Sequence, residues 1–351
     1  MLSRFSLAAI IGGLLNLLYV DNAPDHLRPY VIRQYATAQS TMLPREIFRF
    51  YITGASSNNA FTLLTANAPG NPSWNVLPHI HERHFENFYC FKGRYQLWAQ
   101  AQDNTTQQTR VLTQGDFGAV VRNSTHTFQT IDPDTQLGGM LVPGGFEELF
   151  LTIGNASHPS THSPYDPAFV NQTYSLTATE SDIGQQQAFD VYSQLRFQPR
   201  RDAINGTAPA GTTWHTGPNQ LAEFGRPYFI ANGFGPKFLN NESSYQVIQP
   251  LVSPTQAGDL NFTMSTITVS TTPPNVTVPT WNLNNIQAFQ VLEGMLSIQI
   301  ASYDVANLTT GDSDPYFTKA MLMSQGYDGV DQQLISRGFP WDSAMFPNRW
   351  S

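Results

Sequence analysis

The residues best suited to chemistry are two histidines and a glutamate in the segment PHIHERHFE, together with one histidine further along the chain. His79 and His81 are two positions apart, so on a β-strand their side chains would point to the same face. Glu86 follows within the same segment, and His126 lies beyond an apolar stretch. Three neutral imidazoles and a carboxylate can form a site for a first-row transition metal that leaves room for a substrate.

Short strands joined by turns are expected to position the first three of these residues. Residues 82–85 should turn the chain, after which Glu86 opens a strand and shares a face with Phe88. Residues 87–100 are rich in aromatic side chains and predict a strand, a turn at Gly93 and a second strand. This arrangement would return Glu86 to the neighbourhood of the two histidines.

The remaining histidines of this region are expected to differ in role. An apolar run at residues 117–121 is followed by a turn signal at residues 123–124. The strand that resumes there would carry His126 and Phe128 on one side. His84 lies between the first two strands, and we expect it to be a solvated turn residue rather than a ligand.

The pattern resembles the cupin superfamily, whose first motif ends in H-x-H-x4-E-x6-G and whose second motif carries a single histidine. Two positions depart from the family pattern: Ser73 replaces the opening glycine, and Val121 replaces the proline of the second motif. Both are loop or strand-edge positions, so the ligand set is unaffected. The matching residues are His79, His81, Glu86, Gly93 and His126.

Further segments resemble the fungal quercetin 2,3-dioxygenases, among them APDH, RPYVIR, HTFQ, VPGGFE and NGTAPA. The resemblance begins at about residue 22 and extends to the end of the chain, with one gap. It implies an all-β bicupin fold of two jelly-roll barrels joined by an irregular linker, the second barrel incomplete. It also implies a copper-dependent enzyme that opens the heterocyclic ring of flavonols with O2 and releases carbon monoxide and a depside.

The resemblance also assigns roles to residues. The three histidines would hold copper(II), although these ligand types also accept other first-row divalent metals. Glu86 would take the proton of the flavonol 3-hydroxyl, and it could also bind the metal when substrate is absent. Strand parity and the resemblance together predict an apolar substrate pocket, with ordinary core packing as the alternative for each member. Its lining would be Phe48, Leu64, Phe88, Phe128, Leu137 and Leu141.

Two other functions remain open at this point. Another metal-dependent cupin enzyme, such as one that degrades oxalate with manganese, would need a polar pocket with cationic groups, which the aromatic lining disfavours. A non-catalytic cupin that binds or stores a ligand would usually lose the metal ligands, which this chain keeps. The partners implied are a small flavonol and O2, and a homodimer is compatible with the sequence.

The chain contains an internal duplication. The segment PHIH at residues 78–81 aligns with PTWN at residues 279–282, which places Gln287 opposite Glu86. The second copy has therefore lost its ligands. After Asp312, its last apolar run begins fewer residues further on than the corresponding run does after Asp116 in the first copy. A strand is therefore expected to be missing there. The predicted division is a signal peptide at 1–18, a cupin with the metal site at 19–150, a linker at 151–204 and a cupin without a metal site at 205–351.

Composition favours a secreted β-rich protein. The net charge of −8 argues against a nucleic-acid partner, and only 13% of the 351 residues are charged. The apolar N-terminal stretch at residues 5–18 is too short for a stable membrane span and is typical of a signal peptide. Nine N-glycosylation sequons agree with a secretory route to the extracellular space. They are at Asn104, Asn123, Asn155, Asn171, Asn205, Asn241, Asn261, Asn275 and Asn307.

Overall fold

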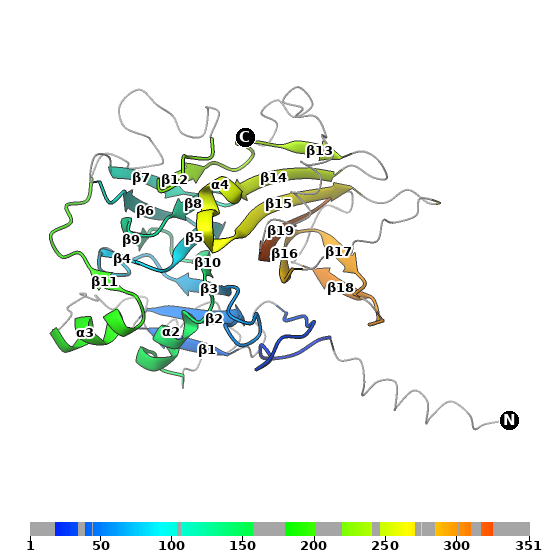
Figure 1. Ribbon diagram of the computed structural model, residues 1–351, viewed down its shortest axis with the longest axis horizontal. Coiled ribbons are helices and arrows are strands. Elements are labelled where there is room, and N and C mark those ends of the chain that lie inside the picture. The colour runs from blue at the N-terminus through cyan, green and yellow to red at the C-terminus, as the bar shows by residue number, and fades with distance from the viewer. Residues whose placement is uncertain are drawn as a thin grey trace.

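The structure, a computed structural model, describes residues 18–33, 39–43, 45–103, 107–156, 180–200, 220–240, 246–270, 275, 285–300, 302–309 and 317–325. Within these residues, antiparallel β-sheets make up most of the regular structure and the helices are short (Figure 1). The all-β class predicted from the sequence is therefore confirmed. No helix in this part of the chain is long and apolar enough to cross a membrane.

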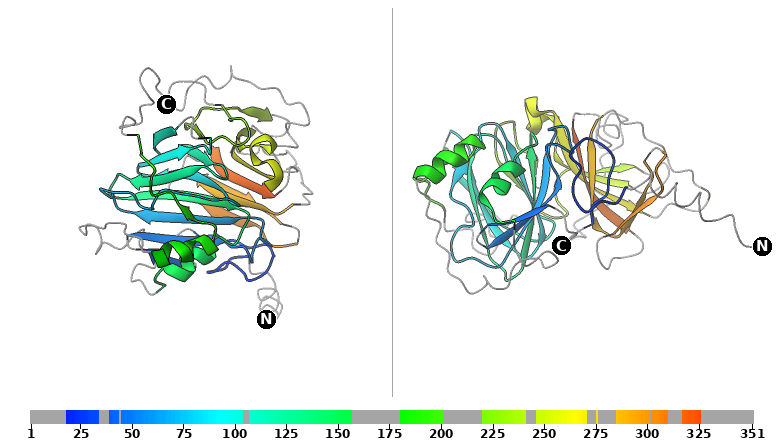
Figure 2. Two further views of the ribbon diagram at one scale, coloured as in Figure 1. Left: turned by 60° about the vertical axis from the view of Figure 1, so that its left-hand side comes forward. Right: turned by 90° about the horizontal axis from the view of Figure 1, so that it is seen from below.

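The first half of the chain forms two antiparallel sheets around a shared core, as a jelly-roll barrel does (Figure 2). One sheet has the strand order β1-β2-β3-β10-β5-β8-β12, and the other has the order β11-β4-β9-β6-β7. The strands of the first sheet are β1 (Ser40–Leu43), β2 (Glu46–Ile52), β3 (Thr62–Ala68), β10 (Thr135–Val142), β5 (Phe85–Lys92), β8 (Phe117–Val120) and β12 (Tyr228–Ile230). Those of the second are β11 (Tyr192–Ser193), β4 (His79–Ile80), β9 (Thr125–Thr130), β6 (Tyr95–Gln100) and β7 (Gln107–Leu112).

Strand β5 shows how the sequence positions the site. Its side chains alternate between two cores, because successive residues of a strand point to opposite faces. Phe88 belongs to the core between the two sheets, whereas Phe85 and Tyr89 belong to a second core shared with the other half of the chain. The rings of Phe85 and Phe262 lie 5.3 Å apart there. Each buried phenyl ring contributes roughly 1.5–3 kcal/mol, so this alternation keeps Glu86 on the inner face.

The second half repeats the strand order of the first. Its main sheet has the order β13-β14-β15-β19-β16, which corresponds to β1-β2-β3-β10-β5. Gly294 follows β16 with a φ of 87°, as Gly93 follows β5 with a φ of 69°, a left-handed conformation that favours glycine in tight turns. The strands are β13 (Phe238–Asn240), β14 (Gln246–Val252), β15 (Phe262–Ser270), β16 (Gln287–Glu293), β19 (Phe317–Gln325) and the pair β17 (Met295–Ile298) and β18 (Ala306–Thr309).

The outer edge of the repeated sheet differs from that of the first. Strand β5 has β8 as its second neighbour, whereas among the described residues β16 is paired only with β19. The strand that was predicted to be missing would lie beside β16. Residues 310–316 and 276–284 are outside the described residues, so the incomplete second barrel stays a prediction.

Two features modify the predicted division of the chain into domains and linker. The described part contains helix α3 (Glu180–Ala188), so the prediction of a wholly irregular linker is wrong there. The helix escapes sequence analysis because it has no apolar stripe; its apolar anchors, Phe189 and Val191, follow it and pack into the first core. In addition, β12 comes from the segment predicted as the second domain, yet it pairs with β8 of the first barrel.

The other helices are short. Helix α2 (Glu147–Ile153) follows β10 and packs against β1, and in Figure 1 it lies near α3 at the lower left. Helix α4 (Pro254–Ala257) and the 3₁₀ helix η3 (Gly258–Leu260) connect β14 to β15. Helices α2 and α3 therefore belong to the barrel that carries the histidines.

Candidate metal centre

The four residues predicted as metal ligands come together inside the first barrel. One potential ligand atom from each of His79, His81, Glu86 and His126 lies within 4.8 Å of those of the other three. His79 on β4 is directly opposite His126 on β9, and their rings are 4.2 Å apart. His81 follows β4 and Glu86 belongs to β5. Thus both sheets contribute to one cluster, and His126 reaches it from a separate strand, as the sequence predicts.

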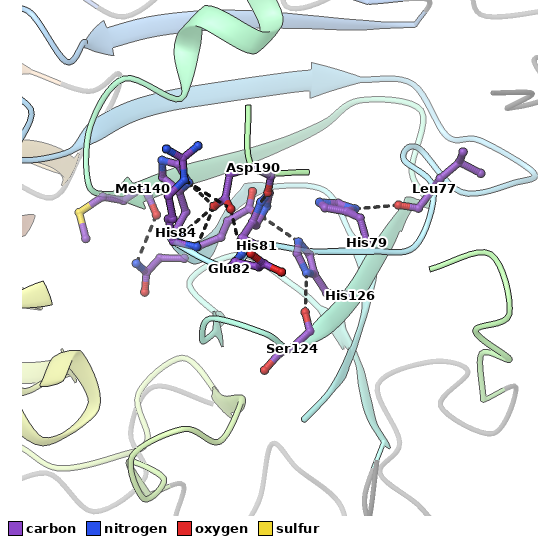
Figure 3. A network of polar contacts seen from close by, with 12 residues as sticks. Leu77, His79, His81, Glu82, His84, Ser124, His126, Met140 and Asp190 are labelled. Carbon is purple, nitrogen blue, oxygen red and sulfur yellow. Dashed lines mark hydrogen bonds and ion pairs between the residues drawn. The ribbon is translucent and has the colours of Figure 1, made fainter. Parts of the chain in front are cut away.

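The three histidines are held by the same kind of hydrogen bond. The Nδ1 atom of His79 is 2.7 Å from the carbonyl oxygen of Leu77, and that of His126 is 3.1 Å from the carbonyl oxygen of Ser124. The Nδ1 atom of His81 is 2.8 Å from the carbonyl oxygen of Asp190 (Figure 3). A carbonyl oxygen only accepts, so each Nδ1 carries the proton and each Nε2 is free to bind a metal.

The donor set fits a divalent transition metal. Burial, together with the neighbouring His126 and His81, lowers the pKa of His79 well below its usual value. A lowered pKa keeps this imidazole neutral at pH 7, which is the form that binds a metal. A set of neutral imidazoles with one carboxylate suits zinc, copper, iron or nickel. The site can therefore hold a metal, and the donor types leave its identity open.

Glu86 supplies the negative charge of the cluster. Its Oε2 atom is 3.2 Å from Nε2 of His81 and 2.9 Å from Nε2 of His126. Burial opposes ionisation, but the close polar contacts with His126 and His81 outweigh it and lower the pKa of Glu86 below its usual range. The carboxylate is therefore ionised at neutral pH and can bind a metal or accept a proton.

Apolar side chains surround the cluster. The ring of Phe88 lies 6.0 Å from that of His126 and 5.9 Å from that of Phe128. All six residues predicted to line the substrate pocket are buried members of the first core. This burial also fits the alternative considered for each of them, ordinary core packing. Their contact with a substrate stays a prediction. They are Phe48, Leu64, Phe88, Phe128, Leu137 and Leu141.

Two aromatic residues near the cluster were missed by sequence analysis. The ring of Phe146 packs edge-on against His81 at 5.0 Å, and the ring of Phe150 stacks on Phe48 at 4.3 Å. Both lie at α2, which is too short for a periodic signal. Phe146 does belong to the VPGGFE segment, so its resemblance to the family could have indicated it.

His84 is not a solvated turn residue, and that prediction is wrong. Its side chain is buried, and its Nδ1 atom lies 2.6 Å from Oδ2 of Asp190. Burial alone would raise the pKa of Asp190, but the hydrogen bonds from His84 and from the backbone of Arg83 lower it to about 2. Asp190 also escaped sequence analysis, because it lies in the linker and far from His84 in sequence.

The predicted glycosylation sites are only partly within the described residues. Asn155, Asn261, Asn275 and Asn307 are exposed, and Asn123 is half-buried. Asn104, Asn171, Asn205 and Asn241 lie outside the described residues. The exposed positions are accessible to a glycan, and glycosylation itself stays a prediction.

Two relatives match the chain in sequence. It is 51% identical to quercetin 2,3-dioxygenase of Aspergillus japonicus over 347 residues, which cover 95% of this chain and 99% of that protein. It is 28% identical to quercetin 2,3-dioxygenase of Bacillus subtilis over 139 residues, which cover 40% of this chain and 39% of that protein. No protein-family model matches the chain.

Solved structures resemble the chain more distantly. An oxalate decarboxylase of Bacillus subtilis aligns with 86% of this chain and 80% of its own length, at 11% identity and a TM-score of 0.42. A putative glyoxylate-induced protein of Pseudomonas aeruginosa aligns with 81% of this chain and 83% of its own length, at 8% identity and a TM-score of 0.44. At this level of similarity they say nothing about activity.

Proposed function

Because the chain belongs to the quercetin 2,3-dioxygenase family, we propose that it opens the heterocyclic ring of flavonols such as quercetin with O2, releasing carbon monoxide and a depside. The observation that carries this proposal is the 51% identity over nearly the whole chain. The intact cluster of three histidines and one glutamate supports it, because a flavonol dioxygenase of the cupin type needs a metal.

Copper(II) is the metal we propose for this site. His79, His81 and His126 would hold it through their Nε2 atoms, since each Nδ1 is already bonded to a carbonyl oxygen. Bound there, the metal would act as a Lewis acid and lower the pKa of the flavonol 3-hydroxyl. Imidazole ligands suit copper, although the same donors accept other first-row metals.

Glu86 is proposed as the general base. Its Oε2 atom lies beside two of the imidazoles, so it would face a hydroxyl group placed at their Nε2 atoms. Its lowered pKa keeps the carboxylate ionised. It could take the proton of a hydroxyl group whose own pKa the metal would lower. Deprotonation makes the flavonol ring more electron-rich and hence more reactive toward O2.

The apolar surroundings favour a flat aromatic substrate. Phe88 and Phe128 lie next to His126, and Phe146 lies next to His81. Aromatic rings bind one another through stacked or edge-on contacts and exclude water from the site. A small dianion such as oxalate would gain little from these side chains, which makes the oxalate-type alternative the weaker candidate.

A turnover assay tests the proposed function directly. Purified protein loaded with copper should contain about one metal ion per chain, because the second copy of the motif has Thr280, Asn282 and Gln287 in place of His79, His81 and Glu86. It should bleach quercetin and release carbon monoxide. The matched control is a flavone of the same skeleton without the 3-hydroxyl, which should not react. Metal-loaded protein that consumes oxalate but not quercetin would favour the oxalate alternative, and one that consumes neither would favour a binding protein.

We also propose that the chain is secreted and glycosylated. The short apolar N-terminus and the exposed sequons at Asn155, Asn261 and Asn307 support this route. Protein secreted by a fungal host should lack Met1, and endoglycosidase should visibly reduce its apparent mass. Intracellular, unglycosylated protein with an intact N-terminus would contradict the proposal.

A further inference from the structure

Asp190 is a buried acidic residue at the junction between α3 and β11. Its φ of 69° is left-handed, a conformation that aspartate and asparagine tolerate better than most residues. Phe189 and Val191, on either side of it, pack into the core of the first barrel. These two anchors hold the backbone, so the carboxylate is directed at the turn that follows His81.

The Asp190 carboxylate binds three consecutive backbone N–H groups in that turn. Oδ1 accepts from Glu82 at 3.1 Å, and Oδ2 accepts from Arg83 at 2.9 Å and from His84 at 3.0 Å. Consecutive N–H groups of this kind form a concave anion-binding nest. Nδ1 of His84 adds a fourth donor at 2.6 Å (Figure 3). One linker side chain thus closes the turn at residues 82–84.

The turn matters because it joins two members of the metal cluster, His81 and Glu86. The main-chain oxygen of Asp190 also accepts the hydrogen bond from Nδ1 of His81, at 2.8 Å. Asp190 therefore acts on His81 directly and on Glu86 through the backbone of the turn. Without the carboxylate, three backbone donors in the turn would lose their partner, and the turn would rearrange to satisfy them.

The segment that follows Asp190 runs beside β4, the strand that carries His79. Ser193 on β11 is paired with His79 on β4, and the backbone N–H of Gln194 donates to the carbonyl oxygen of Pro78 at 2.6 Å. Further on, the indole N–H of Trp98 donates to the carbonyl oxygen of Arg200 at 2.8 Å. The linker is thus bonded to the metal-binding strand β4 and, further on, to β6 of the same sheet.

We propose that Asp190 is a positioning residue of the metal centre, which holds the turn at residues 82–84 and the ring of His81 in the geometry that binds the metal. It acts through His81 and Glu86 and touches neither metal nor substrate. The inference rests on the metal site of the proposed function but not on the identity of the substrate. Outer partners of metal ligands typically change metal affinity by about 10–100-fold when they are removed.

Two substitutions separate the contributions of Asp190. Asp190→Gly removes the carboxylate but keeps the left-handed backbone and the main-chain oxygen that binds His81. Asp190→Asn keeps the shape, the backbone conformation and one oxygen acceptor, and removes the charge. We expect Asp190→Gly to weaken copper binding by about 10–100-fold and Asp190→Asn to weaken it less, because the amide oxygen can still accept from the turn.

Asp116 provides the matched control. It is also a buried aspartate of the first barrel, its carboxylate accepts from the backbone N–H of Thr113 and of Asn232, and it likewise joins distant segments. It precedes the first residue of β8, Phe117, whereas Glu86 pairs with the last residue of β8, Val120. Asp116→Asn should therefore lower thermal stability without changing copper affinity.

Copper affinity, the electron paramagnetic resonance spectrum of the copper-loaded protein and thermal melting should be measured for each variant. We expect altered copper hyperfine splitting in the Asp190 variants and a parental spectrum in Asp116→Asn. Parental affinity and spectrum in a folded Asp190→Gly would overturn the inference, as would equal losses in the Asp116 control. If Asp190→Gly does not fold, Asp190→Asn decides by the same measurements. A parent protein that binds copper but leaves quercetin intact would refute the proposed function and leave the inference about Asp190 unaffected.

Discussion

Replacing Glu86 by glutamine is expected to lower quercetin turnover by about 10²–10⁴-fold, the range typical of a lost general base. Glutamine has the size of glutamate but cannot take a proton from the flavonol 3-hydroxyl. The three imidazoles remain, and their Nδ1 atoms keep their carbonyl partners. Metal content should therefore stay near that of the parent, so that the loss lies in turnover rather than in metal binding.

The experiment compares steady-state turnover and metal content of Glu86→Gln with those of the parent. Glu147→Gln is a matched control, because Glu147 is another buried carboxylate of the first barrel, bonded to the backbone N–H of Gly54 at 2.7 Å and to the hydroxyl of Thr62. It should melt at a lower temperature and keep its turnover per metal. Turnover within a factor of about two of the parent in Glu86→Gln would remove this residue from the proposed mechanism.

Replacing His126 by alanine is expected to empty the metal site and abolish turnover. His126 is the only proposed ligand on β9, and it lies directly opposite His79. Its loss leaves two imidazoles and one carboxylate, and Glu86 also loses its 2.9 Å partner. The metal would then be held by one fewer imidazole, and Glu86 is a movable carboxylate, so the remaining groups should hold it poorly.

Elemental analysis of His126→Ala, purified without added metal, should fall from about one metal ion per chain to near zero. His26→Ala is the matched control, because His26 is two-thirds exposed, with 66% of its side chain accessible, and bonded to the adjacent Asp25. It should keep both metal and turnover. A full complement of metal in folded His126→Ala would mean that His126 is not a ligand.

The sequence was sufficient to predict His79, His81 and Glu86 as one group because their spacing is local, and His126 was predicted from its place in the second cupin motif. Side chains two positions apart on a strand share a face, which brings His79 to the side of His81 and Glu86 to the side of Phe88. The duplication was also predictable, since PHIH at residues 78–81 aligns with PTWN at residues 279–282 at a spacing that places Gln287 opposite Glu86. Both inferences depend on spacing along the chain, which a sequence displays directly.

Other features were decided only by tertiary structure. Asp190 meets His84 across more than one hundred residues, and Phe146 reaches His81 from a separate element. Strand β12 likewise completes a sheet of the first barrel from beyond the linker. No periodic pattern in the sequence marks these contacts, because each arises when a buried donor, acceptor or ring is paired by the packing of distant segments. Burial requires such partners, but only the folded chain determines which residues supply them.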